Sequence, residues 1–297
     1  MRKRYSQSWL CLFLFVFPDL LTMSIPLCRL LEHLHRLAPP ELAEPWDNTG
    51  LLLGDSNREA ESVLVCLDVT LAVLHEAIVH HCQAVISHHP PIFKPLARID
   101  LSEPSGKILQ TAIVHGIALI ACHTNLDSAA GGVSDALAHA LGLTGCQPLQ
   151  AIAGHAGAGL GRIGQYSAPV ASEEFLRRVM AATANPALPI AGEMPETIKT
   201  VALCGGSGSE LAPLAQKLGA DVYLSGEIKH STARWAWESA FCIIDGGHWG
   251  TERLAIDLLA DWLGGLGIAV HRAETEKSPF NLVHHPAHAT PITRRTM

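Results

Sequence analysis

The sequence has little charge and almost no concentrated positive charge. Asp, Glu, Lys and Arg make up 16% of its 297 residues, the formal net charge is −7, and the only basic run is at residues 2–4. Nucleic acid is bound through clustered Lys and Arg, so this distribution argues against a nucleic-acid binder. After residue 25 no stretch approaches the ~18 apolar residues that a membrane span needs. With 48% hydrophobic residues, the composition predicts a soluble globular protein without a membrane partner.

C-x-x-C pairs are also missing. The eight cysteines stand at positions 11, 28, 66, 82, 122, 146, 204 and 242, and several lie inside apolar runs such as 63–67 and 241–244. This usage predicts buried, reduced thiols rather than a disulfide framework, which would be dense in a much smaller secreted chain. It therefore favours a cytoplasmic location.

The first 22 residues conflict with that location, because the basic residues 2–4 precede the apolar segment 9–17, as in a signal peptide. No A-x-A cleavage site follows. We expect Met23 to be the natural start and residues 1–22 to be a leader or upstream extension, with an export signal as the alternative.

The other end of the chain also lacks pattern. Residues 284–297 are rich in Pro, His and Thr and show no periodicity, which predicts a tail without fixed structure. His284, His285 and His288 resemble a metal site, but a flexible segment must lose its ordering entropy to chelate an ion. We expect specific metal binding elsewhere.

Strands and helices alternate along the rest of the chain, and this order indicates an α/β fold. The apolar spacing predicts helices at 25–37, 71–81 and 210–218, and strands at 51–53, 63–67, 84–86, 117–121, 201–204, 221–224 and 242–244.

The two halves of the sequence match at a constant offset. Cys66 and Cys204 are 138 positions apart, as are Ser87 and Ser225, and each half later carries an H-x-x-x-[DE] turn after an apolar strand. We therefore expect a divergent internal duplication, with two similar α/β/α layered halves and mixed sheets at 23–145 and 146–283. A period of this size excludes a solenoid.

A glycine-rich segment, 205–208, stands between a predicted strand and helix. Such a loop can offer backbone N–H groups to an anion. It lacks the G-x-G-x-x-G order and the acidic residue expected some 20 positions on, so a simple tight turn is the favoured interpretation.

Histidines and carboxylates follow the predicted strands. His88 and His89 end one strand, and in a turn stiffened by Pro90 and Pro91 they can serve two adjacent ions. A lone buried histidine is more often an ordinary core residue. The alternative to metal binding is therefore that these histidines are structural residues of the core.

The two H-x-x-x-[DE] turns add to this set. His248 and Glu252 are four residues apart, so they fall near one face if a helix starts there. Alone, this spacing usually means an ion pair on a helix face. His123 and Asp127 repeat it, and the mixed imidazole and carboxylate set suits zinc, iron or manganese.

The motifs together resemble the NIF-three-like dinuclear metal-binding family, often labelled GTP cyclohydrolase I type 2 homologues, from about residue 23 to about residue 283. The short spacing between Asp127 and His248 resembles the short form of the family. The resemblance is carried by WDNTGL at 46–51, SHHPP at 87–91, HTNLD at 123–127 with GGVS at 131–134, SGE at 225–227, and GH at 247–248 with TER at 251–253.

The resemblance implies two divalent metal ions per chain inside a homo-oligomer, a toroidal hexamer. The implied ligands are His88, His89, Asp127, His248 and Glu252, with Glu252 bridging. His123 and Glu227 are the candidate acid–base groups.

The function expected from the resemblance is that of a metal-dependent hydrolase acting on a small molecule, with ring-opening hydrolysis of a purine nucleotide as the reaction that the label suggests. The alternative is a non-enzymatic metal-handling or regulatory ring protein. Turnover that depends on bound metal and on Glu252 would indicate the hydrolase rather than the non-enzymatic protein.

Overall fold

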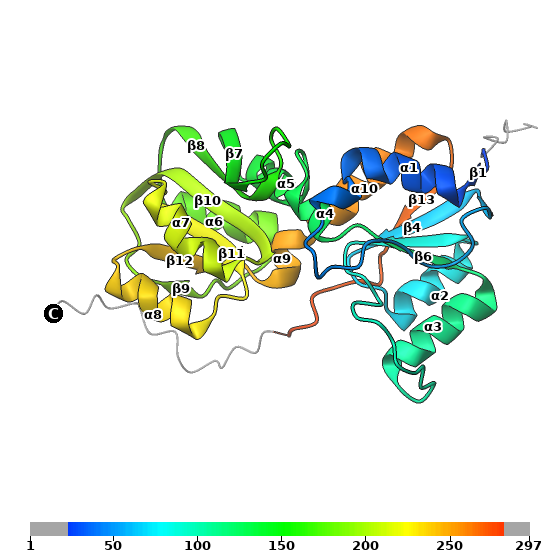
Figure 1. The fold of residues 1–297 in the computed structure, drawn as a ribbon. Coiled ribbons are helices and arrows are strands. Elements are labelled where there is room, and N and C mark those ends of the chain that lie inside the picture. The colour runs from blue at the N-terminus through cyan, green and yellow to red at the C-terminus, as the bar shows by residue number, and fades with distance from the viewer. Residues whose placement is uncertain (1–22, 282–297) are drawn as a thin grey trace, which may run out of the picture.

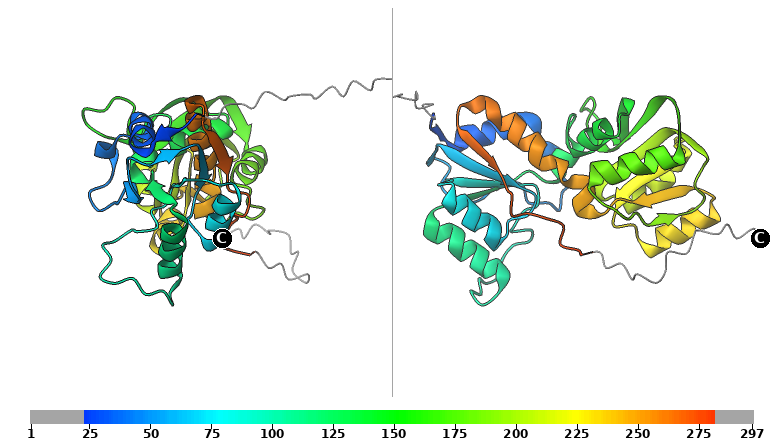
Figure 2. Two further views of the ribbon diagram at one scale, coloured as in Figure 1. Left: turned by 90° about the vertical axis from the view of Figure 1, so that its right-hand side faces the viewer. Right: turned by 180° about the vertical axis from the view of Figure 1, so that it is seen from behind.

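Two β-sheets, each covered by helices, form two lobes that lie side by side in the computed structural model (Figures 1 and 2). The structure describes residues 23–281, so the leader 1–22 and the tail 284–297 lie outside the described residues. No helix within the described part is both long enough and apolar enough to cross a membrane.

The first lobe contains a five-stranded mixed sheet of order β13-β4-β5-β6-β2. The helices α1 and α10 pack on one face of this sheet, and α2 and α3 on the other. Its elements are α1 (Leu27–Leu37), β2 (Gly50–Leu53), β4 (Ser62–Cys66), α2 (Leu71–Val79), β5 (Ala84–Ser87), α3 (Pro104–His115), β6 (Ala118–Ala121), α10 (Leu254–Leu263) and β13 (Ala269–Arg272). The short strands β1 (Ile25–Pro26) and β3 (Glu59–Ala60) pair with each other beside it.

The second lobe contains a six-stranded mixed sheet of order β7-β8-β10-β11-β12-β9. The helices α5 and α6 cover one face, and α7 and α8 the other. Its elements are α5 (Val133–Ala140), β7 (Thr144–Ala151), β8 (Gly159–Ala171), α6 (Ser172–Thr183), β9 (Ile190–Ala191), β10 (Thr197–Ser207), α7 (Ala212–Lys217), β11 (Val222–Gly226), α8 (His230–Glu238) and β12 (Cys242–Asp245). Short 3-10 turns lie at η1 (Pro40–Leu42), η2 (Ser209–Leu211) and η3 (Gly264–Leu266).

The expected α/β fold with two similar halves is confirmed by the topology. Each sheet has three parallel central strands, β4-β5-β6 in one and β10-β11-β12 in the other. The third strand of each set also pairs antiparallel with a short edge strand, β2 or β9. Because the central strands are buried on both faces, they read as continuous apolar runs.

The lobes exchange helices. The helix α5 comes from the first half of the chain but packs on the second sheet, whereas α10 and β13 come from the second half and join the first lobe. The expected division of the sequence into 23–145 and 146–283 stays a prediction. The two lobes do not follow this division at α5, α10 and β13, because each of these elements packs on the lobe formed mainly by the other half. The exchange places two further short helices, α4 (Thr124–Ser128) and α9 (His248–Glu252), between the lobes (Figure 1).

The segment 205–208 is not the simple turn that the glycines favour. The strand β10 continues to Ser207, with an irregular register between Leu203 and Ser207 where Gly206 has a φ of +58°. A residue without Cβ adopts this left-handed conformation at little cost. The glycines therefore bend the end of a central strand.

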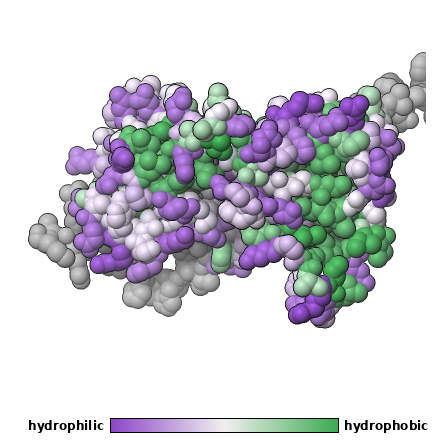
Figure 3. All heavy atoms as spheres, viewed as in Figure 1, coloured by the Kyte–Doolittle hydropathy of each residue, from purple (hydrophilic) through white to green (hydrophobic). Residues whose placement is uncertain are grey.

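Large apolar side chains remain exposed on the first lobe. Val79 at the end of α2 and Ile113 and Val114 on α3 are 72%, 58% and 71% exposed. Figure 3 shows apolar side chains gathered over much of this lobe, while the second lobe is more mixed. Exposed apolar surface of this kind often marks a contact surface.

Candidate metal centre

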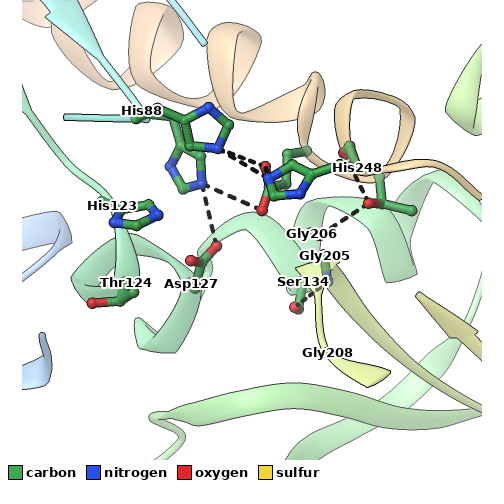
Figure 4. Close-up of polar contacts among 12 residues, drawn as sticks. His88, His123, Thr124, Asp127, Ser134, Gly205, Gly206, Gly208 and His248 are labelled. Atoms are coloured by element: carbon green, nitrogen blue, oxygen red, sulfur yellow. Dashed lines mark hydrogen bonds and ion pairs between the residues drawn. The ribbon is translucent and has the colours of Figure 1, made fainter. Parts of the chain in front are cut away.

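Histidines and carboxylates from both halves of the chain meet between the lobes (Figure 4). His88 and His89 follow β5, Asp127 lies on α4, and His248 and Glu252 lie on α9. The helices α4 and α9 directly follow β6 and β12, so all five residues stand at carboxyl ends of parallel strands. Functional groups gather at this edge in α/β folds.

His88, Asp127 and Glu252 form the first group of candidate ligands. The Nε2 atom of His88 lies 3.5 Å from Oδ1 of Asp127 and 3.7 Å from Oε1 of Glu252. These distances are too long for hydrogen bonds. Nε2 of His88 and Oδ1 of Asp127 are buried and have no hydrogen-bond partner among the described residues. Buried polar atoms without partners are rare and point to an ion or water between them.

His89, His248 and Glu252 form the second group. The Nε2 atoms of the two histidines lie 3.0 and 2.9 Å from Oε2 of Glu252 and 3.2 Å from each other. Glu252 is common to both groups and offers one oxygen to each. Within each group the ligand atoms lie within 4.8 Å of one another, so each group could hold a metal ion.

The far nitrogens of His88 and His89 are held by hydrogen bonds to other groups. Nδ1 of His88 is 2.8 Å from the carbonyl oxygen of Cys122, and Nδ1 of His89 is 2.9 Å from Oδ1 of Asp68. Nδ1 of His248 lies 3.2 Å from Oε1 of Glu227, but it has no hydrogen-bond partner among the described residues. Partners of this kind fix the orientation of metal-binding histidines. All three rings turn Nε2 towards the centre.

His123 stands beside the first group as the residue before α4. Its Nδ1 atom is 2.7 Å from Oδ1 of Asp47, whose Oδ2 accepts a hydrogen bond from the backbone N–H of Thr124. The ring centroid of His123 lies 5.4 Å from that of His88 and 5.5 Å from that of His89. His123 is thus fixed next to the centre without belonging to either group that contains Glu252.

The electrostatics reflect two buried carboxylates among several imidazoles. Burial raises the pKa of Asp127 to about 6. Burial opposes the charged form of Glu252 as well, but the neighbouring imidazoles of His248, His88 and His89 hold the pKa of Glu252 well below its usual value. Burial alone would lower the pKa of His89, yet its hydrogen bonds to Asp68 and Glu252 raise that pKa to about 10. Buried charged groups are costly unless they are paired with opposite charges or coordinate a metal ion.

Glycines at the ends of β10 and β11 make room for α9. A Cβ atom on Gly206 would overlap Oε1 of Glu252 and lie 3.4 Å from Nε2 of His248. A Cβ atom on Gly226 would lie 2.7 Å from the backbone of His248. The backbone N–H of Gly206 also donates to Oγ1 of Thr251, the residue before Glu252. The bent strand end therefore lies against the Glu252 carboxylate and binds the residue before it.

The structure brings together all five residues that the sequence predicts as ligands, and it places His123 beside them. Glu227 lies on the far side of His248, against Nδ1. Sequence reasoning missed three partners: Asp47, Asp68 and the carbonyl of Cys122. Asp68 follows the buried strand β4 by two residues, so its position after a strand was the available signal. For Asp47 the signal was its place within the WDNTGL segment.

Comparison with known proteins decides the relationship. The profile of the family described as Duf34/NIF3 (NGG1p interacting factor 3) matches residues 26–279. The chain belongs to the Duf34/NIF3 family. It is 31% identical over 266 residues to a Streptomyces coelicolor protein named GTP cyclohydrolase 1 type 2 homolog, covering 86% of this chain and 93% of that protein. It is also 34% identical over 209 residues to NIF3-like protein 1 of Drosophila melanogaster, covering 69% of this chain and 70% of that protein.

Solved structures share the fold. Staphylococcus aureus protein SA1388 superposes with a TM-score of 0.80 at 29% identity, covering 87% of this chain and 99% of that one. A Bacillus cereus protein related to NIF3 has a TM-score of 0.81 at 22% identity over the same shares of the two chains. The resemblance noted in the sequence is therefore confirmed at the level of family and fold.

Proposed function

We propose that the chain binds two divalent metal ions, one held by His88, Asp127 and Glu252 and the other by His89, His248 and Glu252. The observation that carries this proposal is a pair of buried atoms, Nε2 of His88 and Oδ1 of Asp127, that lie 3.5 Å apart and have no hydrogen-bond partner within residues 23–281. A cation between them would satisfy both. The shared Glu252 supports a bridging role, since its two oxygens point to different groups.

The donor set fits the proposed ions. Three imidazoles and two carboxylates, without a thiolate among them, suit zinc, iron or manganese. The carbonyl next to Nδ1 of His88 and the carboxylate next to Nδ1 of His89 would hold these two histidines in the tautomer that leaves Nε2 free.

We further propose that the centre serves a metal-dependent hydrolase acting on a small molecule. When bound, such a pair of ions polarises the substrate and lowers the pKa of water towards neutrality. The names of several relatives suggest opening of a purine ring as one version of this chemistry.

His123 is the proposed acid–base group of this reaction. Its Nδ1 atom is bound to Asp47, so its Nε2 atom is the one free to exchange a proton beside the centre. A carboxylate partner of this kind orients a histidine for general acid–base work. Glu227 stays a candidate for the same work, although its position at Nδ1 of His248 favours an orienting role.

The test is turnover of a panel of purine nucleotides and simple esters by metal-loaded and metal-free protein. We expect product only from the loaded form. Glu252→Gln should abolish metal binding and turnover together, whereas His123→Gln should keep the metal and lose turnover. Full activity of metal-free protein, or of both variants, would contradict the proposal.

A second candidate function is metal handling, and one observation favours it. The side chains of His89 and His248 are 22% and 30% exposed, whereas those of His88 and Glu252 are 0% and 4% exposed. One proposed position therefore opens to solvent and the other is enclosed. Rapid exchange of one ion per chain into a competing chelator, without turnover of any substrate, would support this alternative over the hydrolase.

A homo-oligomer in the cytoplasm completes the proposal. The exposed apolar residues on α2 and α3 give the first lobe a surface suited to self-association, and a toroidal hexamer is the expected form. The seven cysteines among the described residues are all free thiols, as expected in a reducing compartment. Light scattering on purified protein would measure the number of subunits.

A further inference from the structure

Residues 273–281 follow β13 and run from the first lobe towards the second (Figures 1 and 2). The segment is held where it starts, because the backbone N–H of Ala273 donates to the carbonyl oxygen of Val65 at 2.9 Å. Farther on, residues 278–281 line a cleft of about 710 Å³ together with His89 and His248. One stretch of chain therefore connects the edge of the first sheet with the exposed side of the candidate metal centre.

Two carboxylates fix the middle of this segment. Glu76 on α2 accepts hydrogen bonds from two backbone N–H groups of the segment, at 2.7 and 3.1 Å. Glu276 belongs to the segment itself, and its carboxylate accepts hydrogen bonds from the backbone N–H groups of Leu67 and Asp68, at 2.7 and 2.6 Å. These two N–H groups come directly after β4, where the pairing of that strand with β5 and β13 ends. Leu67 is fully buried, and a buried backbone N–H needs such a partner.

The two residues that Glu276 binds both contact His89. The carbonyl oxygen of Leu67 accepts a hydrogen bond from the backbone N–H of His89 at 2.9 Å. Oδ1 of Asp68 lies 2.9 Å from Nδ1 of the same residue. The first contact fixes the main chain of His89 and the second fixes its ring. Outer partners of this kind orient metal ligands and raise the affinity of the site.

The other two histidines of the centre are supported differently. Nδ1 of His88 lies 2.8 Å from the carbonyl oxygen of Cys122, the residue after β6. Nδ1 of His248 has no hydrogen-bond partner in the described part of the chain. The hydrogen bonds of Glu276 therefore lead to His89, which belongs to the second group of ligands, and not to His88, which belongs to the first.

We infer that Glu276 is a positioning residue for the second group of ligands. It holds the backbone at 67–68 in the place from which this loop orients His89, and it thereby raises the affinity of that group for its ion. This role rests on the proposed function for the presence of the ion. The effect is confined to one of the two proposed ions, because the first group contains His88 instead.

Zinc titration by calorimetry compares Glu276→Ala with Glu274→Ala in the full chain. Glu274 is exposed and meets Glu76 through its backbone N–H, which the substitution leaves in place. We expect Glu276→Ala to weaken the binding of one ion by about tenfold and Glu274→Ala to weaken neither. Glu276→Gln keeps one of the two acceptor oxygens, so its affinity should lie between those of wild type and Glu276→Ala. Unchanged affinity in Glu276→Ala, or an equal loss of both ions, would overturn the inference.

A double mutant tests the connection through Asp68. Asp68→Ala removes the carboxylate at Nδ1 of His89 directly. If Glu276 acts through this contact, Asp68→Ala combined with Glu276→Ala should cost less binding free energy than the sum of the two single losses. Additive losses would mean that Glu276 acts by another route and would overturn the inference.

Amide hydrogen exchange in the metal-free protein separates the failure of this role from the failure of the proposed function. The backbone N–H of His89 is bound to Leu67, and that of His88 is bound to Cys66. We expect Glu276→Ala to speed exchange at His89 by about tenfold and to leave His88 as in wild type. If wild type bound fewer than two ions, the proposed function would fail, and exchange at His89 would still decide the role of Glu276. Wild-type exchange at His89 in Glu276→Ala would overturn the inference in either case.

Discussion

Gly206→Ala tests how the bent end of β10 supports the centre. A Cβ atom at this position would overlap Oε1 of Glu252 and lie 2.8 Å from its Cδ atom. Ordinary contact begins at 3.4 Å, so the carboxyl carbon must retreat by about 0.6 Å, whereas metal–ligand distances tolerate about 0.2 Å. We expect the affinity for both proposed ions to fall by at least about 100-fold, since Glu252 belongs to both groups.

The matched control is Gly219→Ala. Gly219 also has a positive φ, +81° against +58° at Gly206, but a Cβ atom there would meet nothing within 4 Å. Both variants carry the strain of an L-residue in the left-handed region, about 1–2 kcal/mol, and only Gly206→Ala displaces Glu252. Gly219→Ala should therefore lose some stability and keep its metal affinity.

Metal titration by calorimetry, with circular dichroism to check the fold, is the assay for this pair. Wild-type affinity for both ions in a folded Gly206→Ala protein would refute the reasoning, as would an equal loss in the two variants. Loss of a single ion would show that Glu252 does not serve both groups.

Three further predictions concern stability and the division of the ligands. Hydrogen bonds from His123 and Thr124 outweigh burial and lower the pKa of Asp47 from 3.8 to about 2. Asp47 thus adds about 2 kcal/mol of stability above pH ~4 that is lost as the pH falls through ~2. In urea titrations, Asp47→Asn should be less stable than wild type at neutral pH, and the gap should close on acidification. Arg162 is 2% exposed and binds both carboxylate oxygens of Asp135 at 2.7 Å, so Arg162→Met should cost about 3–5 kcal/mol, against at most about 1 kcal/mol for the exposed Arg29→Met. Elemental analysis should find both ions missing from Glu252→Ala and one from Asp127→Ala.

Other results would contradict these three predictions. A stability gap for Asp47→Asn that widened towards pH ~2 would reverse the sign derived from its lowered pKa. Equal losses in Arg162→Met and Arg29→Met would mean that the buried pair does not hold α5 to the second sheet. Equal, single-ion losses from Glu252→Ala and Asp127→Ala would remove the bridging role while leaving the ligand set intact.

Much of the architecture could be predicted because the central strands are buried on both faces. Segments such as β5 are apolar runs that end in polar residues, and the carboxyl ends of parallel strands share one edge. That geometry alone suggests that His88, His89 and the two H-x-x-x-[DE] turns converge. The equal offsets of Cys66 to Cys204 and Ser87 to Ser225 fall on matching strands for the same reason.

The exchange of α5 and α10 could not be predicted in this way. An amphipathic helix reveals which of its faces is buried, but its sequence does not say which of two similar sheets buries it. The β7–β8 hairpin was also invisible, because β7 is largely exposed and both strands are rich in Gly and polar residues. Partners such as Asp68 are single acidic residues in loops, where no spacing distinguishes them from solvated side chains.

The central claim is that two metal ions share Glu252 between the lobes. Anomalous diffraction from crystals of the metal-loaded protein, at the zinc, iron and manganese edges, tests it most directly. The account predicts two peaks per chain, one among His88, Asp127 and Glu252 and the other among His89, His248 and Glu252. One peak, or peaks away from Glu252, would contradict it.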